Sequence, residues 1–359
     1  MELIKLYIEP TSRCNLDCPM CMRRTWEEPT GDMPDAVFGR ILDDIRAFSP
    51  RPIVFFGGIG EPLLHPRIAD MVARAKATGA RTELITNGTL LTPELSLEIL
   101  RAGLDFLWIS LDGASSETHA VSRGGASLTT VIENIAGFRE AILRGGGRGG
   151  CCGFIPNFNV QIGIEFVATK HNIGELPEMI TLARRLGATR LLVSNILPYA
   201  PEMQREALYL EKLAGGDGLS VILPATDLAA IPAEAFGPAI GQGTLLPRCP
   251  FIEGGAMAVG WDGGVSPCLP LLHTHRTYLF DRERLAHRWI LGKITERTLP
   301  DLWVLPEHVA FRKRVKAFEF PPCVACHCVL SARNEEDCLG NPFPTCGGCL
   351  WAYGFIRCP

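Results

Sequence analysis

Short apolar runs alternate with amphipathic segments along the first part of the chain. The apolar runs have the length of β-strands, and the segments between them repeat their apolar positions at helical spacing, as Val37, Ile41, Leu42 and Ile45 do. The pattern predicts strands at residues 3–9, 52–56, 82–86, 104–112, 159–168 and 190–197. It predicts helices between them at residues 33–48, 66–78, 93–102, 128–143 and 175–186.

This alternation of strands and helices favours an α/β fold. Strand–helix repeats imply parallel strands joined by right-handed crossovers. The repeats are too few to close an eight-stranded barrel, so residues 1–200 are expected to form a partial (βα)6 TIM-like barrel. Active groups then gather at the carboxyl ends of the strands.

The rest of the chain differs in composition. Residues 201–247 are rich in Gly, Pro and Ala and are interpreted as a connector. Residues 248–359 hold many cysteines and show little periodicity, which predicts a small domain stabilised by metal. The glycine-rich stretch 144–154 is expected to be a flexible loop, with Cys151 and Cys152 as a surface feature.

Composition narrows the class of protein. Of 359 residues, 47% are hydrophobic and 21% charged, which is typical of a globular chain. A net charge of −4 gives no reason to expect nucleic-acid binding, and no apolar run is long enough for a membrane span. The chain starts without an export signal, so we expect a cytoplasmic protein. Because disulfides are rare there, the 14 cysteines indicate metal binding or catalysis.

Three cysteines follow the first predicted strand directly. Cys14, Cys18 and Cys21 have the spacing C-x3-C-x2-C. Thiolates on a tight loop hold iron–sulfur clusters, and three of them leave one iron of a cubane open to a ligand. The alternative is a zinc knuckle, but structural zinc takes four ligands and no fourth Cys or His lies nearby.

This segment resembles the signature of the radical S-adenosylmethionine (SAM) superfamily, including Met20 before the third cysteine. The resemblance implies an enzyme that uses a 4Fe–4S cluster to cleave SAM reductively to a 5′-deoxyadenosyl radical. That chemistry belongs to the cofactors, and the protein positions them. No residue stands out as the hydrogen or proton donor, so the catalytic side chains stay unassigned.

Several polar and glycine residues at predicted strand ends are candidates for SAM binding. The segment 55–66 resembles the GGE motif of the superfamily, and Ser110 and Asp112 are expected to contact ribose hydroxyls. The predicted SAM-binding residues are Met20, Gly57, Gly58, Gly60, Glu61, Thr86, Asn87, Ser110, Asp112 and Arg123. Glu165 and Asn195 are further candidates. The alternatives are a plain glycine turn, an Asp-Gly turn, a surface arginine and polar barrel lining.

Nine cysteines lie near the C-terminus: Cys249, Cys268, Cys323, Cys326, Cys328, Cys338, Cys346, Cys349 and Cys358. Two four-thiolate clusters need eight of them, which leaves one spare. The opening Cys249…Gly263-x4-Cys268 resembles the SPASM extension of radical SAM enzymes, which implies two auxiliary 4Fe–4S clusters. A zinc-binding tail is the alternative.

The SPASM resemblance also implies a pairing of these thiols. It places Cys249, Cys268 and Cys349 at one cluster and Cys323, Cys326, Cys346 and Cys358 at the other. Cys328 or Cys338 then completes the first cluster, or one of them is free.

Two other features carry weaker hypotheses. His273 and His275 either line the substrate pocket, tune a cluster or lie in a polar loop. The basic run 311–316 is interpreted as a solvated helix face, or as a dock for an acidic electron donor.

Local segments including residues 57–66 and 344–359 narrow the resemblance to radical SAM maturases associated with tungsten-cofactor oxidoreductases. The implied role is modification of such an oxidoreductase or of its tungstopterin, with ferredoxin or flavodoxin as the low-potential electron donor. Two alternatives stay open. One is a SPASM enzyme that modifies peptides, and the other is a non-catalytic iron–sulfur carrier or zinc scaffold.

Overall fold

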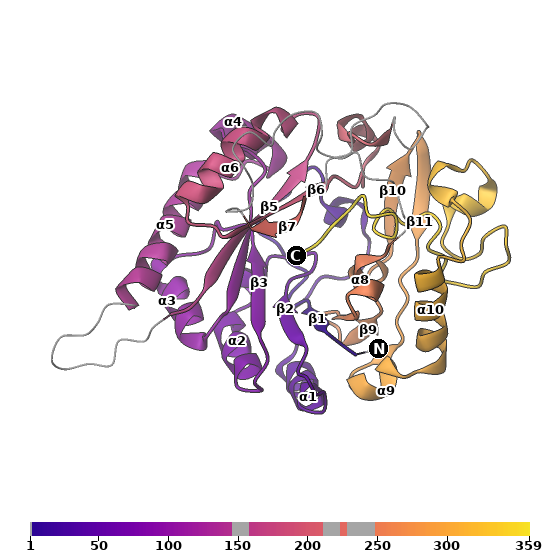
Figure 1. Ribbon diagram of the computed structural model, residues 1–359, viewed down its shortest axis with the longest axis horizontal. Coiled ribbons are helices and arrows are strands. Elements are labelled where there is room, and N and C mark those ends of the chain that lie inside the picture. Colours follow the sequence, from indigo (N-terminus) through magenta and orange to yellow (C-terminus); the bar gives the residue numbers. More distant parts are fainter. Residues whose placement is uncertain (1, 146–157, 211–222, 228–247) are drawn as a thin grey trace.

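The computed structural model describes residues 2–145, 158–210, 223–227 and 248–359 (Figure 1). Cys151 and Cys152 therefore lie outside the described residues. No helix within these ranges is both long and apolar enough to cross a membrane.

The described strands form one large sheet and one hairpin. The sheet holds β1 (Lys5–Ile8), β2 (Ile53–Phe56), β3 (Thr82–Thr86), β4 (Phe106–Ser110), β5 (Gln161–Ala168), β6 (Arg190–Asn195), β7 (Leu223–Asp227), β8 (Ala256–Val259), β9 (Gly264–Ser266) and β12 (Gly292–Lys293). Its order is β12-β9-β8-β1-β2-β3-β4-β5-β6-β7. Strands β1 to β6 run parallel to one another, and β7 is antiparallel to β6. The end strands β12 and β7 do not pair with each other, so the barrel is open. This confirms the predicted partial barrel of six parallel strands.

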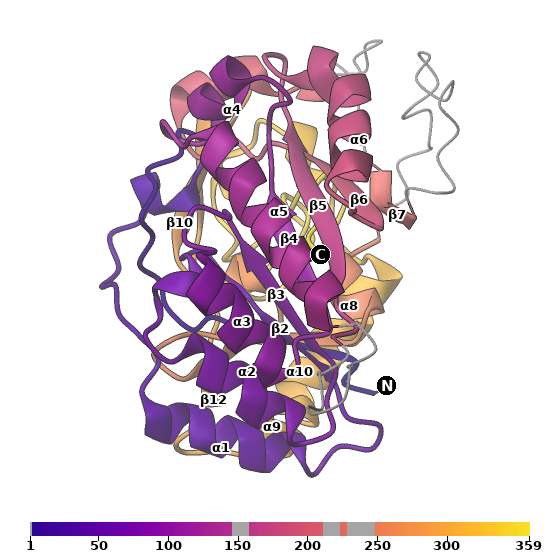
Figure 2. The same ribbon diagram turned by 90° about the vertical axis from the view of Figure 1, so that its left-hand side faces the viewer.

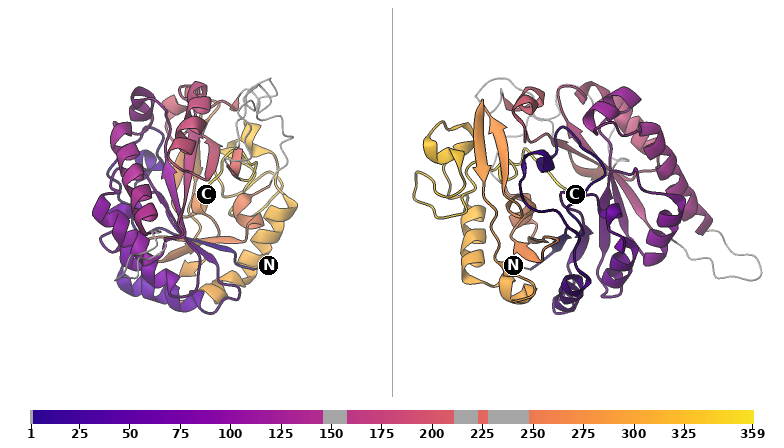
Figure 3. Two further views of the ribbon diagram at one scale, coloured as in Figure 1. Left: turned by 60° about the vertical axis from the view of Figure 1, so that its left-hand side comes forward. Right: turned by 180° about the vertical axis from the view of Figure 1, so that it is seen from behind.

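Helices cover the outer face of this sheet. They are α1 (Asp35–Ile45), α2 (Ile68–Lys76), α3 (Pro93–Ala102), α4 (Ser116–Ser122), α5 (Leu128–Gly145) and α6 (Leu176–Arg185). Figure 2 shows them side by side in front of the strands. The inner face is turned toward the C-terminal part of the chain (Figure 3).

Side chains that alternate between the two faces of each strand divide the apolar core into two clusters. In β4, Leu107 and Ile109 pack against the helices, whereas Phe106 and Trp108 point to the inner side. Successive side chains of a strand point to opposite faces, so each barrel strand supplies both clusters. The inner cluster reaches the C-terminal segment, because Tyr7 of β1 packs in it with Phe355. The chain end is thereby fixed against the barrel by apolar contacts.

The predicted elements agree with the structure where local signals mark their ends. Helix α3 occupies the predicted residues 93–102, because Thr92 accepts a hydrogen bond from the Leu95 amide and Gly103 adopts a left-handed φ of 84°. Helix α4 was not predicted, since its residues Ser116–Ser122 lack an apolar stripe. Its first turn is fixed by the Ser115 cap instead.

The C-terminal part contributes to the main sheet as well as to its own fold. Strand β8 pairs in parallel with β1, and β9 and β12 continue the sheet beyond it. The hairpin of β10 (His275–Leu279) and β11 (Arg282–Ala286) stands apart, with α8 (Pro250–Glu253), α9 (Leu299–Trp303) and α10 (Pro306–Ala317) beside it. Short 3-10 turns are η1 (Met22–Thr25), η2 (Pro62–Leu64), η3 (Ile173–Glu175), η4 (Pro201–Glu206), η6 (Leu269–Leu271), η7 (Cys323–Ala325) and η8 (Val329–Ala332).

The structure corrects the interpretation of the basic run 311–316 as a solvated helix face. The run lies in α10, but Phe311, Arg312 and Val315 are buried. The Arg312 guanidinium lies 3.9 Å from the Trp303 ring centroid and donates to the Trp303 carbonyl. Only part of the run is therefore a solvated face, because one of its arginines packs as an aromatic-stacked core residue.

Candidate active site

One open cavity on the inner face gathers most of the predicted site residues. Its empty space is about 1090 Å³, including solvent at its mouth, which suits a ligand of cofactor size. Its lining includes Cys14, Cys18, Met20, Cys21, Gly58, Gly60, Glu61, Thr86, Asn87, Ser110, Arg123, Glu165 and Asn195. Most of these residues come from the loop after β1 and from the carboxyl ends of the barrel strands, whereas Glu165 lies within β5 and Arg123 directly follows α4. The location is the one expected for parallel barrels.

The three N-terminal thiols sit on a tightly bonded loop. The Cys21 amide donates to the Cys18 carbonyl at 3.0 Å, and the Leu16 amide lies 3.4 Å from the Cys14 sulfur. Burial raises the pKa of Cys21 to about 11 and also raises the pKa of Cys18, although Arg123 opposes the latter shift. Iron binds the thiolate form, so metal binding at these thiols releases protons.

Glu61 joins the loop after β2 to the end of β3. Its carboxylate is buried and accepts hydrogen bonds from Thr86 Oγ1 at 2.8 Å and from the amides of Asn87 at 2.8 Å and Leu63 at 3.0 Å. The Asn87 side chain in turn donates to the Asn15 side chain on the thiol loop at 2.9 Å. This hydrogen-bond network therefore fixes the loop after β2, the end of β3 and the thiol loop relative to one another.

Two glycines permit close approach of these loops. A β-carbon at Gly60 would overlap the carbonyl oxygen of Thr11 on the thiol loop. Gly124 has a φ of +61°, and a β-carbon there would lie 2.7 Å from the Asp17 carbonyl oxygen. Gly57 was predicted to bind SAM, but it does not line the cavity. Its amide donates to Ile8 at 2.9 Å and continues the pairing of β2 with β1.

Asp112 also differs from the prediction. Its carboxylate is fully buried behind the cavity wall, 2.5 Å from Arg123 Nε, and accepts from the Val167 amide at 2.7 Å. Burial alone would lower the pKa of Arg123, but the Asp112 carboxylate raises it. Asp112 therefore holds a cationic Arg123 in the cavity wall, and only the arginine is placed to meet a ligand.

Glu165 and Asn195 line the cavity, and their contact with SAM stays a prediction. Ser110 Oγ lies 3.2 Å from a Glu165 carboxylate oxygen, and burial raises the pKa of Glu165 to about 7. Tyr199 lines the cavity too and was missed, because nothing local in its sequence distinguishes it from a core tyrosine.

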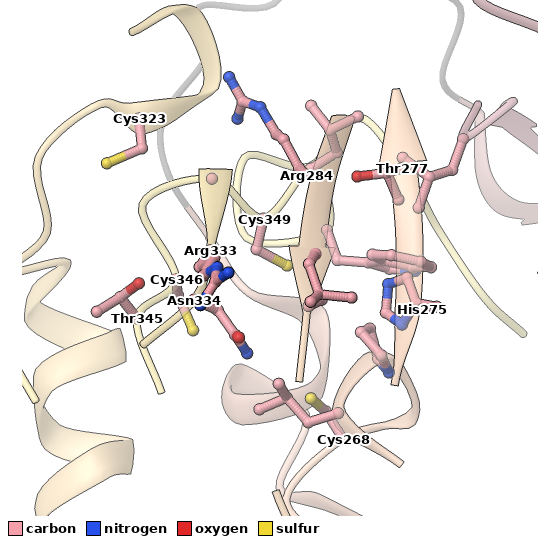
Figure 4. Close-up of a pocket in the computed structure, with 18 of the residues that line it drawn as sticks. Cys268, His275, Thr277, Arg284, Cys323, Arg333, Asn334, Thr345, Cys346 and Cys349 are labelled. Carbon is pink, nitrogen blue, oxygen red and sulfur yellow. The ribbon is translucent and has the colours of Figure 1, made fainter. Parts of the chain in front are cut away.

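A second cavity collects C-terminal thiols. Its lining includes Cys249, Cys268, Cys323, Cys346 and Cys349. In Figure 4, Cys268, Cys346 and Cys349 surround a common space, and Cys323 lies at its far side. The pKa of Cys346 is raised by burial and by the charges of Cys349, Cys249 and Cys268. We call these four thiols group A, defined as Cys249, Cys268, Cys346 and Cys349.

Four further thiols lie near one another. Burial raises the pKa of Cys323 to about 11, and Cys328, Cys326 and Cys338 add to this shift. The Cys328 amide lies 3.4 Å from the Cys326 sulfur. We call Cys323, Cys326, Cys328 and Cys338 group B. Cys358 lines the cavity of Cys14, Cys18 and Cys21, and its charge adds to the effect of burial in raising the pKa of Cys268 in group A. The structure thus differs from the implied pairing at Cys346 and Cys358.

His273 ties the C-terminal part to the thiol loop. Its ring nitrogens lie 2.8 Å from Glu28 and 2.9 Å from Glu9, and the ring stacks on Trp26 at 4.3 Å between centroids. Burial opposes protonation, but hydrogen bonds to the two carboxylates raise the pKa of His273 to about 9. His275 lines the second cavity, and burial lowers its pKa to about 4. His273 is therefore a structural cation, and its role is visible only in three dimensions.

The donor set at all three places consists of cysteine thiols, which are the usual ligands of iron–sulfur clusters. Among the described residues, no three His, Cys, Asp or Glu side chains converge closely enough to hold one metal ion. A cubane holds its thiolates around a larger volume than a zinc ion does. Three thiols line one cavity and four make up each C-terminal group, which are the numbers of thiolates that an open and a fully ligated 4Fe–4S cluster take.

Comparison with protein families agrees with this geometry. Residues 8–173 match the radical SAM superfamily, and residues 249–328 match the SPASM iron–sulfur cluster-binding domain. The chain belongs to the radical SAM superfamily, and it is a radical SAM enzyme with a SAM-binding 4Fe–4S cluster and auxiliary clusters. Membership of this superfamily excludes the two alternatives of a non-catalytic iron–sulfur carrier and a zinc scaffold.

Two individual proteins are similar to this chain in sequence. The chain is 34% identical over 373 residues to the tungsten-containing aldehyde ferredoxin oxidoreductase cofactor-modifying protein of Pyrococcus furiosus, covering 99% of this chain and 96% of that protein. It is 30% identical over 208 residues to the PqqA peptide cyclase of Gluconobacter oxydans, covering 57% of this chain and 53% of the cyclase.

Solved structures share the fold. SuiB of Streptococcus suis bound to S-adenosylmethionine superposes with a TM-score of 0.58 at 16% identity, covering 92% of this chain and 72% of SuiB. Native anSMEcpe with bound AdoMet gives a TM-score of 0.57 at 17% identity, covering 98% of this chain and 96% of that chain. At such identities the likeness concerns the fold alone.

Proposed function

We propose that this radical SAM enzyme matures a tungsten-dependent oxidoreductase, by modifying that enzyme or its tungstopterin cofactor. The observation that carries the proposal is the 34% identity, over nearly the whole of both chains, to a protein named for modifying such a cofactor. That similarity covers 99% of the chain and so includes the C-terminal thiols, whereas the PqqA peptide cyclase aligns over 57% of the chain.

Within the first cavity, we assign each lining residue a part in holding the cofactors. Cys14, Cys18 and Cys21 hold the SAM-binding cluster, which supplies one-electron reduction of the SAM sulfonium when both are bound. Met20, Gly58, Gly60, Glu61, Thr86, Asn87, Ser110 and Arg123 surround SAM, with the Glu61 network orienting the loops. Of these residues, Glu61, Thr86, Asn87 and Ser110 are buried.

Groups A and B each have the four thiols that a 4Fe–4S cluster requires. We assign one auxiliary cluster to each group. They provide a route for electrons from a low-potential donor, ferredoxin or flavodoxin, toward the first cavity. Thiol groups of this kind persist in a reducing compartment, which supports a cytoplasmic location.

A peptide-modifying role is the second candidate function. The observation that favours it is the 30% identity to the PqqA peptide cyclase. The open cavity is compatible with either target, since it is lined by both thiols and polar strand ends.

Two measurements test the proposal. The first compares wild-type protein with the Cys14→Ala/Cys18→Ala/Cys21→Ala variant after anaerobic reconstitution. Wild type should hold about twelve irons and form 5′-deoxyadenosine with dithionite and SAM, whereas the variant should hold about eight and form none. Retained SAM cleavage in the variant would refute the cluster assignment.

The second measurement distinguishes the targets. Reconstituted enzyme is mixed either with a cofactor-depleted tungsten-dependent aldehyde oxidoreductase plus extracted tungstopterin, or with short peptides. Stimulation of 5′-deoxyadenosine formation and a mass change in the cofactor support the maturase. Stimulation by a peptide alone, with a mass change in that peptide, supports the second candidate.

A further inference from the structure

A buried arginine lies beside the second cavity with part of its guanidinium unpartnered. Arg284 of β11 is 7% exposed and lines the cavity of group A. Its Nη2 donates to the Val324 carbonyl at 2.9 Å, whereas its Nη1 is buried and has no hydrogen-bond partner among the described residues. A guanidinium stays protonated in proteins, and a buried charge requires an opposite charge to compensate it.

The arginine lies where two cysteine turns meet. Turn 323–326 carries two thiols of group B, and turn 346–349 carries two thiols of group A. The Val324 amide donates to the Gly347 carbonyl at 3.1 Å, so the two turns are bonded directly to each other. A β-carbon at Gly347 would lie only 3.1 Å from Cys323 Sγ. Glycine at this position therefore lets the two thiol groups approach each other closely.

Arg284 contacts both turns. One guanidinium nitrogen bonds to the first turn through the Val324 carbonyl, and the other lies beside the second turn, since a β-carbon at Gly348 would be 3.2 Å from Nη1. In Figure 4 the guanidinium extends from β11 to the side of the cavity where Cys323 lies. Burial lowers the pKa of Arg284, and the leading charge that opposes this shift is that of Cys323. The cation is therefore placed among thiols.

Iron–sulfur clusters at these thiols supply the opposite charge that the arginine requires. A 4Fe–4S cluster held by four thiolates is an anion, and the uptake of an electron makes it more negative. Its reduction potential depends on its net charge, on hydrogen bonds to its sulfurs and on its exposure to solvent. Because Coulomb interactions are stronger in a buried site than in water, a fixed cation between two such clusters favours the reduced form of both.

We propose that Arg284 is the shared counter-cation of the two auxiliary clusters, and that it raises the reduction potentials of both so that one low-potential donor can reduce them. The inference rests on the assignment of these clusters to groups A and B, and it does not depend on the target of the enzyme. In the step, each oxidised cluster gains one electron from the donor, and no bond is made or broken.

The test is a redox titration of the reconstituted full-length protein, followed by electron paramagnetic resonance. Wild type is compared with Arg284→Gln, which keeps a side-chain donor but loses the charge, and with Arg284→Lys, which keeps the charge. SAM binds the open iron of the first cluster, so the auxiliary signals are those that stay unchanged when SAM is added.

The expected result is a lower midpoint potential for both auxiliary clusters in Arg284→Gln. At the wild-type midpoint, the ratio of reduced to oxidised cluster should fall at least about tenfold, which is about 59 mV for a one-electron couple. Arg284→Lys should restore most of the wild-type ratio, because the charge is retained although the planar fork is lost.

Arg276→Gln is the matched control for the loss of one positive charge from the same hairpin. Arg276 already pairs with Glu27 and Glu283, and it lines neither cavity. Its auxiliary midpoints should equal those of wild type. Iron is counted in parallel, so that midpoints are compared between proteins that each hold about twelve irons.

Iron counts and midpoints together decide between the outcomes. Unchanged auxiliary midpoints in fully loaded Arg284→Gln overturn the inference, as does an equal shift in Arg276→Gln. A shift confined to one auxiliary cluster overturns the shared role.

Loss of iron also has a defined meaning. If Arg284→Gln holds only about four irons, about twelve in Arg284→Lys support the need for a charge, whereas loss in both variants makes Arg284 a packing residue and overturns the inference. About four irons in wild type would refute the auxiliary-cluster assignment itself. The two failures are therefore distinguishable.

Discussion

The imidazole of His273 lies 2.9 Å from a carboxylate oxygen of Glu9, although 264 residues separate the two in sequence. Glu9 precedes the thiol loop, and Glu28, on the other ring nitrogen, follows it. One side chain from the C-terminal part therefore holds both ends of the loop that presents Cys14, Cys18 and Cys21. The SPASM extension thus supports the SAM-binding cluster mechanically, in addition to any electronic role.

This arrangement predicts a pH-dependent stability. The pKa of His273 is about 9 in the folded protein and near 6.5 when unfolded. The stability that protonated His273 contributes to the folded protein is fully present below pH 6.5. It is lost as the pH rises through about 9. A shift of this size corresponds to about 3 kcal/mol. We expect His273→Gln to lower the thermal midpoint at pH 7 and to flatten its fall between pH 7 and 10.

The control is His171→Gln, at an exposed position. It should follow the wild-type profile. Thermal unfolding followed by circular dichroism across this pH range is the measurement, and parallel profiles for wild type and His273→Gln would contradict the prediction. Iron release to a chelator should also be faster in His273→Gln, because the loop is less constrained.

Glu61→Gln should weaken both folding and SAM binding. Glu61 accepts three hydrogen bonds, and one oxygen faces the Asn87 amide. A glutamine side-chain nitrogen at that position would meet another donor, and an unsatisfied buried donor costs about 1–3 kcal/mol. Chemical denaturation and calorimetric titration with S-adenosylhomocysteine measure the two effects. Glu98→Gln, at an exposed position on α3, is the matched control. Equal stability and equal affinity for S-adenosylhomocysteine in the two variants would contradict the proposed role of Glu61.

We expect Asp112→Asn to lower the free energy of unfolding substantially, although Asp112 does not line the cavity. The change leaves the Arg123 guanidinium buried without its carboxylate partner. Breaking a buried ion pair in this way costs about 3–5 kcal/mol. The double variant Asp112→Asn/Arg123→Met should regain much of the lost stability but bind S-adenosylhomocysteine weakly. Equal unfolding free energies for the single and double variants would show that the pair is not coupled.

Most of the barrel could be predicted from sequence because each strand and helix carries its signal locally. Strand β3 was predicted at its observed bounds, and α3 has a cap at both ends. The three N-terminal thiols are likewise adjacent in the chain, so their spacing alone places them at one site.

The remaining features depend on contacts between distant segments. Glu9 and His273 meet only after the C-terminal part folds against β1 through β8. The Asp112–Arg123 pair could have been predicted in part, because a buried charge requires a partner. The grouping of the C-terminal thiols could not have been predicted from the sequence, because it depends on turns that have no hydrophobic periodicity.

Cys346 provides the sharpest test of that grouping. Sequence resemblance assigns it to the cluster of Cys323, whereas in the structure the thiols that raise its pKa are Cys349, Cys249 and Cys268. If Cys346 and Cys249 both belong to group A, losing either should remove the same cluster. Cys346→Ala, Cys249→Ala and their double variant should therefore each hold about eight irons of about twelve.

Combining Cys346→Ala with Cys338→Ala should remove both auxiliary clusters and leave about four irons. Iron and sulfide analysis of anaerobically reconstituted proteins measures the counts, and circular dichroism confirms that each variant is folded. About four irons in Cys346→Ala/Cys249→Ala would place the two thiols at different clusters. The resemblance-based pairing would then hold, with Cys358 among the cluster ligands.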